Sequence, residues 1–182
     1  ASRRDLNQAV RQELQTKGVV DMVDHALRVL VPRQDLTGAD RQWAERYNPD
    51  DILRYSRGSA ALNIEGGSYA RVVSTNPKEN LVTVEKDSGE QATYDPKRLA
   101  GVSVYREIER EFAVGDRIQF TAPDKELGVS NRELGTIKQI ADGLISASLD
   151  SGKAVDFDPS SRRHFDHGYA VTSHSSQGLT AD

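Results

Sequence analysis

Two stretches of this 182-residue chain carry almost the same order of residue types. VEKDSGEQATYDP at residues 84–96 aligns with ASLDSGKAVDFDP at residues 147–159. Each copy contains Asp-Ser-Gly, which is typical of a hairpin turn because Asp can bond its own backbone and Gly accepts a positive φ angle. An aromatic residue and Asp-Pro then end the strand that follows the turn. We therefore predict a repeated hairpin.

The similarity continues upstream of both hairpins, where short alternating apolar runs are separated by Gly, Asn, Asp and Pro. This texture is typical of small antiparallel barrels and sandwiches. We therefore predict a mainly β chain of the α+β class, with two tandem SH3-like small barrels at residues 49–111 and 112–160. The upstream matches pair residues 52–55, 70–73 and 80–84 with residues 117–120, 135–138 and 143–147. The predicted strands are residues 52–56, 60–64, 69–75, 80–86, 90–94, 116–121, 134–141, 143–149 and 153–157.

The N-terminal segment, residues 1–48, is predicted to contain helices. A helix is expected over residues 4–17, because apolar side chains recur there every four residues. Asp5 is placed to cap its start and Gly18 to end it. The recurring apolar residues are Leu6, Val10 and Leu14.

The rest of this segment allows more than one interpretation. Residues 25–32 alternate as a strand does, but a helix over residues 19–30 fits the same apolar positions. A capping-box pattern at residues 37–40 predicts a further helix, which Asn48-Pro49 would end.

The charge balance limits how the chain could bind nucleic acid. Lys and Arg total 24, Asp and Glu total 28, and the net charge is −4. A protein that binds nucleic acid with its whole surface is usually basic, so any such contact here must be a local patch. Cysteine is absent, which excludes disulfides and thiolate metal sites and fits a cytoplasmic location. No apolar run is long enough for membrane insertion.

The sequence also lacks the usual signatures of an enzyme. It contains no phosphate-cradling G-x-x-x-x-G-K-[ST] loop, no G-x-G-x-x-G and no G-x-S-x-G. His164, Asp166, His167 and His174 lie close in sequence, but their loose spacing is weak evidence for a metal site. We therefore expect no catalytic residue, no bound metal and no cofactor in this chain.

The C-terminal segment, residues 161–182, contains the most specific motif. The letters YAVTSHSSQGLT, residues 169–180, describe a short apolar strand followed by a row of hydroxyl and imidazole groups. A strand-to-loop junction rich in small hydrogen-bond donors is suited to binding phosphate groups. The same residues also fit a hydroxyl-rich turn without a ligand. This stretch resembles motif V of RecD-like superfamily-one helicases. It is most similar to the helicase part of conjugative relaxase–helicases of the TraI/TrwC type.

The resemblance implies roles for individual residues. In that family this segment contacts single-stranded DNA and links it to the ATP site. Ser175 stands where the family usually has a lysine, which removes a positive charge from the expected phosphate contact. Arg162 and Arg163 are further candidates for the DNA contact. The same two residues also fit a pair of solvated surface arginines in a loop. The implied DNA contacts are Thr172, His174, Ser175 and Ser176, and the implied nucleotide-side residues are Gln177 and Gly178.

The resemblance also covers the rest of the chain in order. Residues 4–11 are similar to the helix that follows motif IV, and the two predicted barrels stand where the family inserts an accessory region. Residues 1–48 and 161–182 would then be remnants of a RecA-like domain. The implied function is a non-catalytic accessory module that guides single-stranded DNA, in a larger helicase that uses ATP and magnesium. The implied partners are single-stranded DNA and the rest of that helicase.

A second motif suggests a further partner. GDRIQFT at residues 115–121 matches, except at Ile118, a short motif in translocation signals that type IV secretion machinery recognises in this family. A coupling protein of that machinery would then bind it. The same letters also describe a turn followed by a barrel strand whose Ile118 and Phe120 face the core, and the two interpretations are compatible. The signal residues would be Gly115, Asp116, Arg117, Ile118, Phe120 and Thr121.

Two other functions fit the same sequence. A protein-docking SH3-like module without a DNA role agrees with the acidic net charge. A fragment of a RecD-type DNA-repair helicase would share the C-terminal motif.

Overall fold

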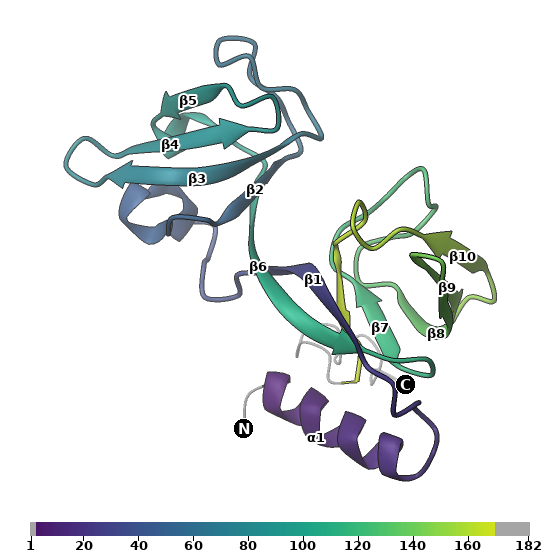
Figure 1. Ribbon diagram of the computed structural model, residues 1–182. Helices are drawn as coiled ribbons and strands as arrows, with labels where there is room; N and C mark the ends of the chain where they lie inside the picture. The colour runs from purple at the N-terminus through teal and green to yellow at the C-terminus, as the bar shows by residue number, and fades with distance from the viewer. Residues whose placement is uncertain (1–2, 170–182) are drawn as a thin grey trace, which may run out of the picture. The chain divides into compact units, whose positions relative to one another are not determined.

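The computed structural model describes residues 3–169 and divides into two compact units (Figure 1). Unit 2 is Val31–Glu107, and unit 1 is built from the chain before and after it, up to Leu30 and from Ile108 onward. Within the described range the chain is mainly β, with a single α-helix and two antiparallel sheets.

The elements follow one another as short pieces of regular structure. In chain order they are α1 (Arg3–Thr16), β1 (His25–Pro32), the 3-10 turns η1 (Asp40–Gln42) and η2 (Ala44–Arg46), β2 (Ile52–Tyr55), β3 (Tyr69–Asn76), β4 (Leu81–Lys86), β5 (Gln91–Tyr94), η3 (Pro96–Arg98), β6 (Val102–Phe112), β7 (Arg117–Phe120), β8 (Leu134–Ala141), β9 (Leu144–Leu149), β10 (Ala154–Phe157) and β11 (Phe165–His167).

Unit 2 forms its core on one face of a sheet with the strand order β1-β6-β2-β3-β4-β5. Leu53 of β2, Val72 of β3 and Val84 of β4 point into this core. Successive side chains of a strand face opposite sides of the sheet, so one face can pack against the core. Tyr55 and Tyr94 complete it and share a hydrogen bond of 2.8 Å between their hydroxyl groups. Burial raises the pKa of Tyr55 to about 12, so this bond persists at neutral pH.

Unit 1 has the strand order β10-β9-β8-β7-β11. Its core combines apolar residues of β7, β8 and β9 with a group of aromatic rings. Phe165 of β11 lies at its centre, with ring centroids 5.1 Å from Phe112 and 5.3 Å from Phe157. A strand as short as β11 is therefore held by ring packing as well as by its hydrogen bonds to β7.

The sequence repeat is confirmed as a repeat of strand order and register. Strands β2 to β5 pair in succession in unit 2, and β7 to β10 pair in the same succession in unit 1. Both copies shift register at the same place in the second hairpin, between Val72 and Ser74 and between Ile137 and Gln139. Because a β-bulge changes which side chains face the core, its duplication indicates one common structural plan.

A lysine closes the same turn in both copies. In unit 2, Lys86 donates hydrogen bonds to the carbonyls of Leu62 and Asn63 at 2.9 and 2.8 Å. In unit 1, Lys153 donates to two carbonyls of the corresponding turn at 3.4 and 3.1 Å. Backbone carbonyls that find no strand partner need another donor, and the long lysine side chain supplies it.

Several predicted elements differ from those observed. Residues 60–64 form a turn closed by a single bridge between Ser59 and Ile64, so the predicted strand is wrong. The helix predicted after residue 37 is replaced by two 3-10 turns. The prediction missed β6 and β11, whereas the strand interpretation of residues 25–32 is confirmed. Among residues 3–169, each sheet has two edge strands without a hydrogen-bonded neighbour on one side, so the predicted closed barrels are wrong.

Helix α1 packs with a polar face inward. Leu6 and Val10 are 49 % and 40 % exposed, whereas Asn7 and Arg11 are 4 % and 1 % exposed. The predicted apolar stripe is therefore not the buried face. Gly18 ends the helix at φ +78°, as expected, but Asp5 lies inside the first turn rather than at its cap.

The buried face of α1 is held by one ionic cluster. Arg11 Nε lies 2.9 Å from Asp116 Oδ2, and its guanidinium also pairs with Asp24. Asp116 is fully buried and accepts further hydrogen bonds from Ala113 N at 2.7 Å and from the Tyr169 hydroxyl. A buried carboxylate is tolerated only when its oxygens are satisfied in this way.

Removing this carboxylate tests how much of unit 1 depends on it. Asp116→Ala should lower the free energy of unfolding by about 3–5 kcal/mol, because it leaves the Arg11 guanidinium buried without its main counter-charge. Asp150→Ala is the matched control. It removes the more exposed partner of Arg117 in the same unit and should cost less than about 1 kcal/mol. Urea unfolding followed by circular dichroism measures both, and equal losses would contradict a special role for Asp116.

Candidate nucleic-acid interface

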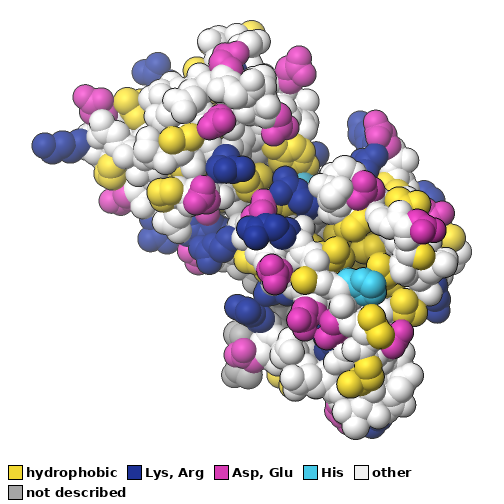
Figure 2. All heavy atoms as spheres, viewed as in Figure 1, with side chains coloured by type: hydrophobic (Ala, Val, Ile, Leu, Met, Phe, Trp, Pro, Cys, Tyr) yellow, Lys and Arg dark blue, Asp and Glu magenta, His cyan; other side chains and the backbone are white. Residues whose placement is uncertain are grey.

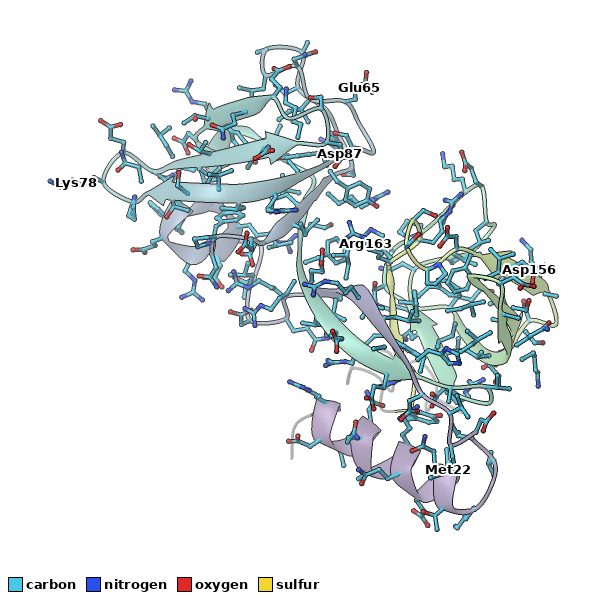
Figure 3. All side chains as sticks on the ribbon, in the orientation of Figure 1. Met22, Glu65, Lys78, Asp87, Asp156 and Arg163 are labelled. Carbon is cyan, nitrogen blue, oxygen red and sulfur yellow. The ribbon has the colours of Figure 1, made fainter. Side chains whose placement is uncertain are left out.

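Arg162 and Arg163, two predicted DNA contacts, differ in their surroundings. Arg162 pairs with Asp124 and lies 2.7 Å from Glu126 Oε2. The hydrogen bond to Glu126 and the charge of Asp124 raise the pKa of Arg162 although burial opposes them, so two carboxylates compete with any phosphate there. Arg163 is half-buried, and its backbone carbonyl accepts a hydrogen bond of 2.7 Å from Leu30 N (Figure 3).

The other motif V residues lie outside the described part of the chain. They are Thr172, His174, Ser175, Ser176, Gln177 and Gly178. The start of that stretch is described, and Tyr169 is fixed by two hydrogen bonds. Its hydroxyl donates to Asp116 and accepts from Arg117 N at 3.1 Å. The segment that resembles motif V therefore begins at the same ionic cluster that holds α1.

The predicted translocation-signal residues mostly face the interior of unit 1. Asp116 and Ile118 are fully buried, and Phe120 and Thr121 are nearly so. Gly115 adopts φ +95°, and a Cβ there would lie 2.4 Å from the carbonyl oxygen of Val19. The structural role expected for this stretch is thus confirmed.

Arg117 is the exception among these residues, since its side chain is 31 % exposed. Its two terminal nitrogens bind Asp150 at 2.6 and 2.7 Å. The hydrogen bonds from Arg117 lower the pKa of Asp150.

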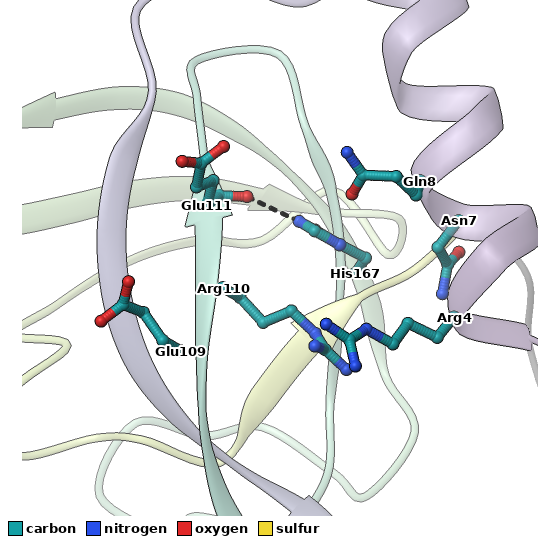
Figure 4. A pocket seen from close by; sticks show the side chains of 7 residues that line it. All are labelled: Arg4, Asn7, Gln8, Glu109, Arg110, Glu111 and His167. Atoms are coloured by element: carbon teal, nitrogen blue, oxygen red, sulfur yellow. Dashed lines mark hydrogen bonds between the residues drawn. The ribbon is translucent and has the colours of Figure 1, made fainter.

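A polar pocket of about 250 Å³ opens in unit 1 beside α1. Figure 4 shows the side chains of Arg4 and Arg110 extending into the same pocket from α1 and β6. The amide side chains of Asn7 and Gln8 line the same space from the helix. The pocket residues are Arg4, Asn7, Gln8, Glu109, Arg110, Glu111 and His167.

One nearby carboxylate orients Arg110 without occupying its whole guanidinium. Arg110 Nε donates to Asp166 Oδ1 at 3.2 Å, and Asp166 is itself buried. The remaining end of the guanidinium lies in the pocket (Figure 4). The carboxylates of Glu109 and Glu111 point away from the two guanidinium groups in the same view. Alternation along β6 explains this, because neighbouring residues of a strand face opposite ways.

His167 forms another wall of the pocket and is only 6 % exposed. Its Nε2 lies 2.7 Å from the carbonyl oxygen of Glu111, which accepts a hydrogen bond when this nitrogen carries the proton. Burial lowers the pKa of His167, because charging the ring inside unit 1 would remove an ion from water. The ring is therefore a neutral donor to the backbone at physiological pH.

The pocket suits a phosphate group or another small oxyanion. Two guanidinium groups that line one pocket repel each other, and an anion bound there relieves that repulsion. Guanidinium forks bind phosphate oxygens in pairs, and the neighbouring amides can donate further hydrogen bonds. Sequence reasoning missed Arg110 because it lies in β6, a strand that was not predicted.

The face shown in Figure 2 has acidic and basic side chains interspersed, with no broad area of one sign. Among residues 3–169, no cluster of three or more His, Asp or Glu side chains could hold a metal ion. The same part of the chain has no helix with the length and apolar character that a bilayer crossing needs.

Comparison with known proteins relates part of this chain to conjugation proteins. Over 125 residues, 66 % of the chain, it is 27 % identical to the multifunctional conjugation protein TraI of Escherichia coli. Over 77 residues, 41 % of the chain, it is 36 % identical to the conjugal transfer protein TraA of Rhizobium radiobacter. The match spans 7 % of the length of each relative. No protein-family model matches.

A solved structure described as DNA unwinding at forked double-stranded DNA by two coordinating Pif1 helicases is 24 % identical over 38 % of this chain and 19 % of that chain. Its TM-score is 0.34, and at that value we draw nothing from the likeness.

The buried neutral state of His167 predicts a pH dependence. Its folded-state pKa lies below the ordinary value of 6.5, so below that pH the unfolded chain binds a proton that the folded chain does not. Stability should therefore fall as the pH drops below 6.5, by at most about 1.4 kcal/mol per pH unit from this group. His167→Gln should flatten the curve of unfolding free energy between pH 5 and 7, and an unchanged slope would contradict the assignment.

Proposed function

We propose that this chain is a non-catalytic, nucleic-acid-binding module of a larger protein that processes DNA during conjugation. It would contact single-stranded DNA, with one backbone phosphate bound between Arg4 and Arg110. The observation that carries this proposal is the convergence of the two guanidinium groups in one polar pocket. The partial similarity to TraI and TraA supports the wider process.

The charges around the pocket favour an anion over a neutral ligand. Arg4 and Arg110 contribute two positive charges, and Asp166 offsets one through the Nε of Arg110. Glu109 and Glu111 also line the pocket, but their carboxylates point away from the guanidinium groups (Figure 4), so the positive charge is confined to the part that Arg4 and Arg110 line. Sequence-independent binding of a strand requires no more than such phosphate contacts, because every nucleotide carries the same phosphate.

The larger protein would supply the energy-coupled steps. In this proposal ATP and magnesium bind elsewhere in it, residues 1–48 and 161–182 belong to a RecA-like domain, and the two repeated units are SH3-like accessory elements. The module itself needs no cofactor to hold a strand. Its expected location is the cytoplasm, where such a motor would meet single-stranded DNA.

A translocation signal remains a second proposal, and exposure limits how it could work. Of the matching residues, Arg117 is the one with a substantially exposed side chain, and it is paired with Asp150. A coupling protein that bound the folded chain would have to recognise this ion pair. Arg117→Ala would then abolish capture by the coupling protein while leaving DNA binding unchanged, which also tests the docking-module alternative.

The phosphate pocket predicts a specific loss of DNA binding. Arg4→Gln combined with Arg110→Gln should weaken binding of a fluorescein-labelled oligo(dT) about tenfold, because the charge-assisted bonds to one phosphate are lost. The slope of log affinity against log salt should fall in magnitude by about 0.7, the value for one phosphate of a single strand. Fluorescence anisotropy at several salt concentrations measures both quantities.

Arg162→Gln combined with Arg163→Gln is the matched control, since it also removes two arginine charges from unit 1. If this pair reduces the salt slope and the pocket pair does not, the contact lies at the sites predicted from the sequence. The single variant Arg4→Gln guards against misfolding, because Arg4 is exposed and lies in the first turns of α1.

A further inference from the structure

Trp43 of unit 2 is a large aromatic side chain that is exposed on the surface. It is the single tryptophan of the chain, lies between η1 and η2, and is 45 % exposed. Exposure alone is common, so the surroundings of the ring decide what it can do.

The backbone on both sides of Trp43 is fixed by one residue of the β3–β4 turn. Ala44 N donates to Asn80 Oδ1 at 2.8 Å, and Asn80 Nδ2 donates to the carbonyl of Gln42 at 3.1 Å. Asn80 Nδ2 also donates to Asp95 Oδ1 at 2.8 Å, which links this turn to the start of η3. The position of Trp43 is therefore set in advance, and little conformational entropy is lost when a ligand binds it.

Lys97 of η3 places its ammonium over the tryptophan. Its Nζ lies 3.9 Å from the centroid of the Trp43 ring. Its backbone amide is held by Asp95 Oδ1 at 2.9 Å, while the side chain is exposed. Within residues 3–169 no ion pair involves Lys97. Among the described residues, the Trp43 ring is therefore the one group that balances the charge of this ammonium.

A groove of about 390 Å³ adjoins this pair and has Lys97 in its wall. Arg41 and Gln42 line the groove from η1, and no Asp or Glu is among its lining residues. Such a wall is unusual for a chain with more acidic than basic residues. Positive charge without carboxylates favours a polyanion, and an aromatic face beside it favours a ligand with flat rings.

We propose that Trp43 and Lys97 form a second contact for single-stranded nucleic acid, in which one base stacks on the indole and Lys97 binds the adjacent phosphate. This inference rests on the proposed function and adds a base-stacking site to it. On binding, the flexible lysine leaves the ring face for the phosphate. Cation–π contacts are weak at exposed sites, whereas base stacking on an aromatic ring is stronger and tolerates any sequence.

The single tryptophan makes this contact directly observable. Unlabelled oligo(dT) of about 15 nucleotides, a length within the usual range of single-strand sites, is titrated into the full chain while tryptophan emission is recorded. Emission should fall with a saturable curve, because a stacked base quenches the indole. Its midpoint should agree with that of the anisotropy of a labelled oligo(dT) of the same length.

An abasic oligomer of the same length separates stacking from charge. It presents the same phosphates without bases, so it should bind more weakly and should leave the emission unchanged. If anisotropy shows binding of oligo(dT) but the emission does not change, the stacking contact is wrong and the proposed function stands. If neither signal changes at low salt, the proposed function itself fails.

Paired lysine variants test the phosphate contact. Lys97→Ala should weaken binding severalfold and reduce its salt dependence. Lys138→Ala is the matched control, because it removes the same charge from an exposed side chain of β8, which belongs to unit 1. Trp43→Ala should weaken binding about tenfold, and Trp43→Phe should retain part of it. Equal effects of the two lysine variants would overturn the assignment of Lys97.

Discussion

The ion pair between Arg11 and Asp116 decides where α1 lies, and the candidate phosphate pocket depends on that placement. The helix turns Asn7 and Arg11 inward and leaves Leu6 exposed, so apolar burial does not dock it. Two charges taken out of water require good geometry, and here the carboxylate accepts from the guanidinium, a backbone amide and a tyrosine hydroxyl. A shifted helix would lose the contacts of Arg11 with Asp116 and Asp24 together.

The same cluster connects segments that are far apart in the sequence. Asp24 lies in the loop after α1, Asp116 in the turn between β6 and β7, and Tyr169 after β11. Arg4 from the helix and Arg110 and His167 from the strands then meet around one space. The pocket thus forms where α1, β6 and β11 pack together in unit 1. Its residues are scattered along the sequence and belong to no shared motif.

The repeated β units could be predicted because their signals are local. Asp-Ser-Gly turns and alternating apolar residues fix a hairpin wherever they occur, and both copies carry them in the same order. Strand β6 escaped prediction because residues such as Arg106, Glu109 and Arg110 interrupt any apolar alternation. The inward face of α1 escaped it because apolar spacing predicts burial of Leu6 and Val10, whereas a charge partner more than 100 residues away decided otherwise.

From the sequence, the chemical type of the candidate site could be predicted, but the residues that form it could not. An acidic chain that binds nucleic acid needs a local basic patch, but which arginines form it depends on pairing. Arg162 lies next to two carboxylates, whereas Arg110 keeps the end of its guanidinium in a pocket. Neither fact is visible without the fold. Trp43 was expected within a helix, whereas it lies between two 3-10 turns and is exposed.

Binding of single-stranded DNA by the chain alone is the most direct test of this account. Labelled single-stranded DNA is titrated with the intact chain at low and at physiological salt, with a duplex of the same length for comparison. The account predicts saturable binding that weakens as salt rises, because phosphate contacts displace counterions. Absence of binding at low salt would contradict it and would leave the docking and translocation-signal proposals in its place.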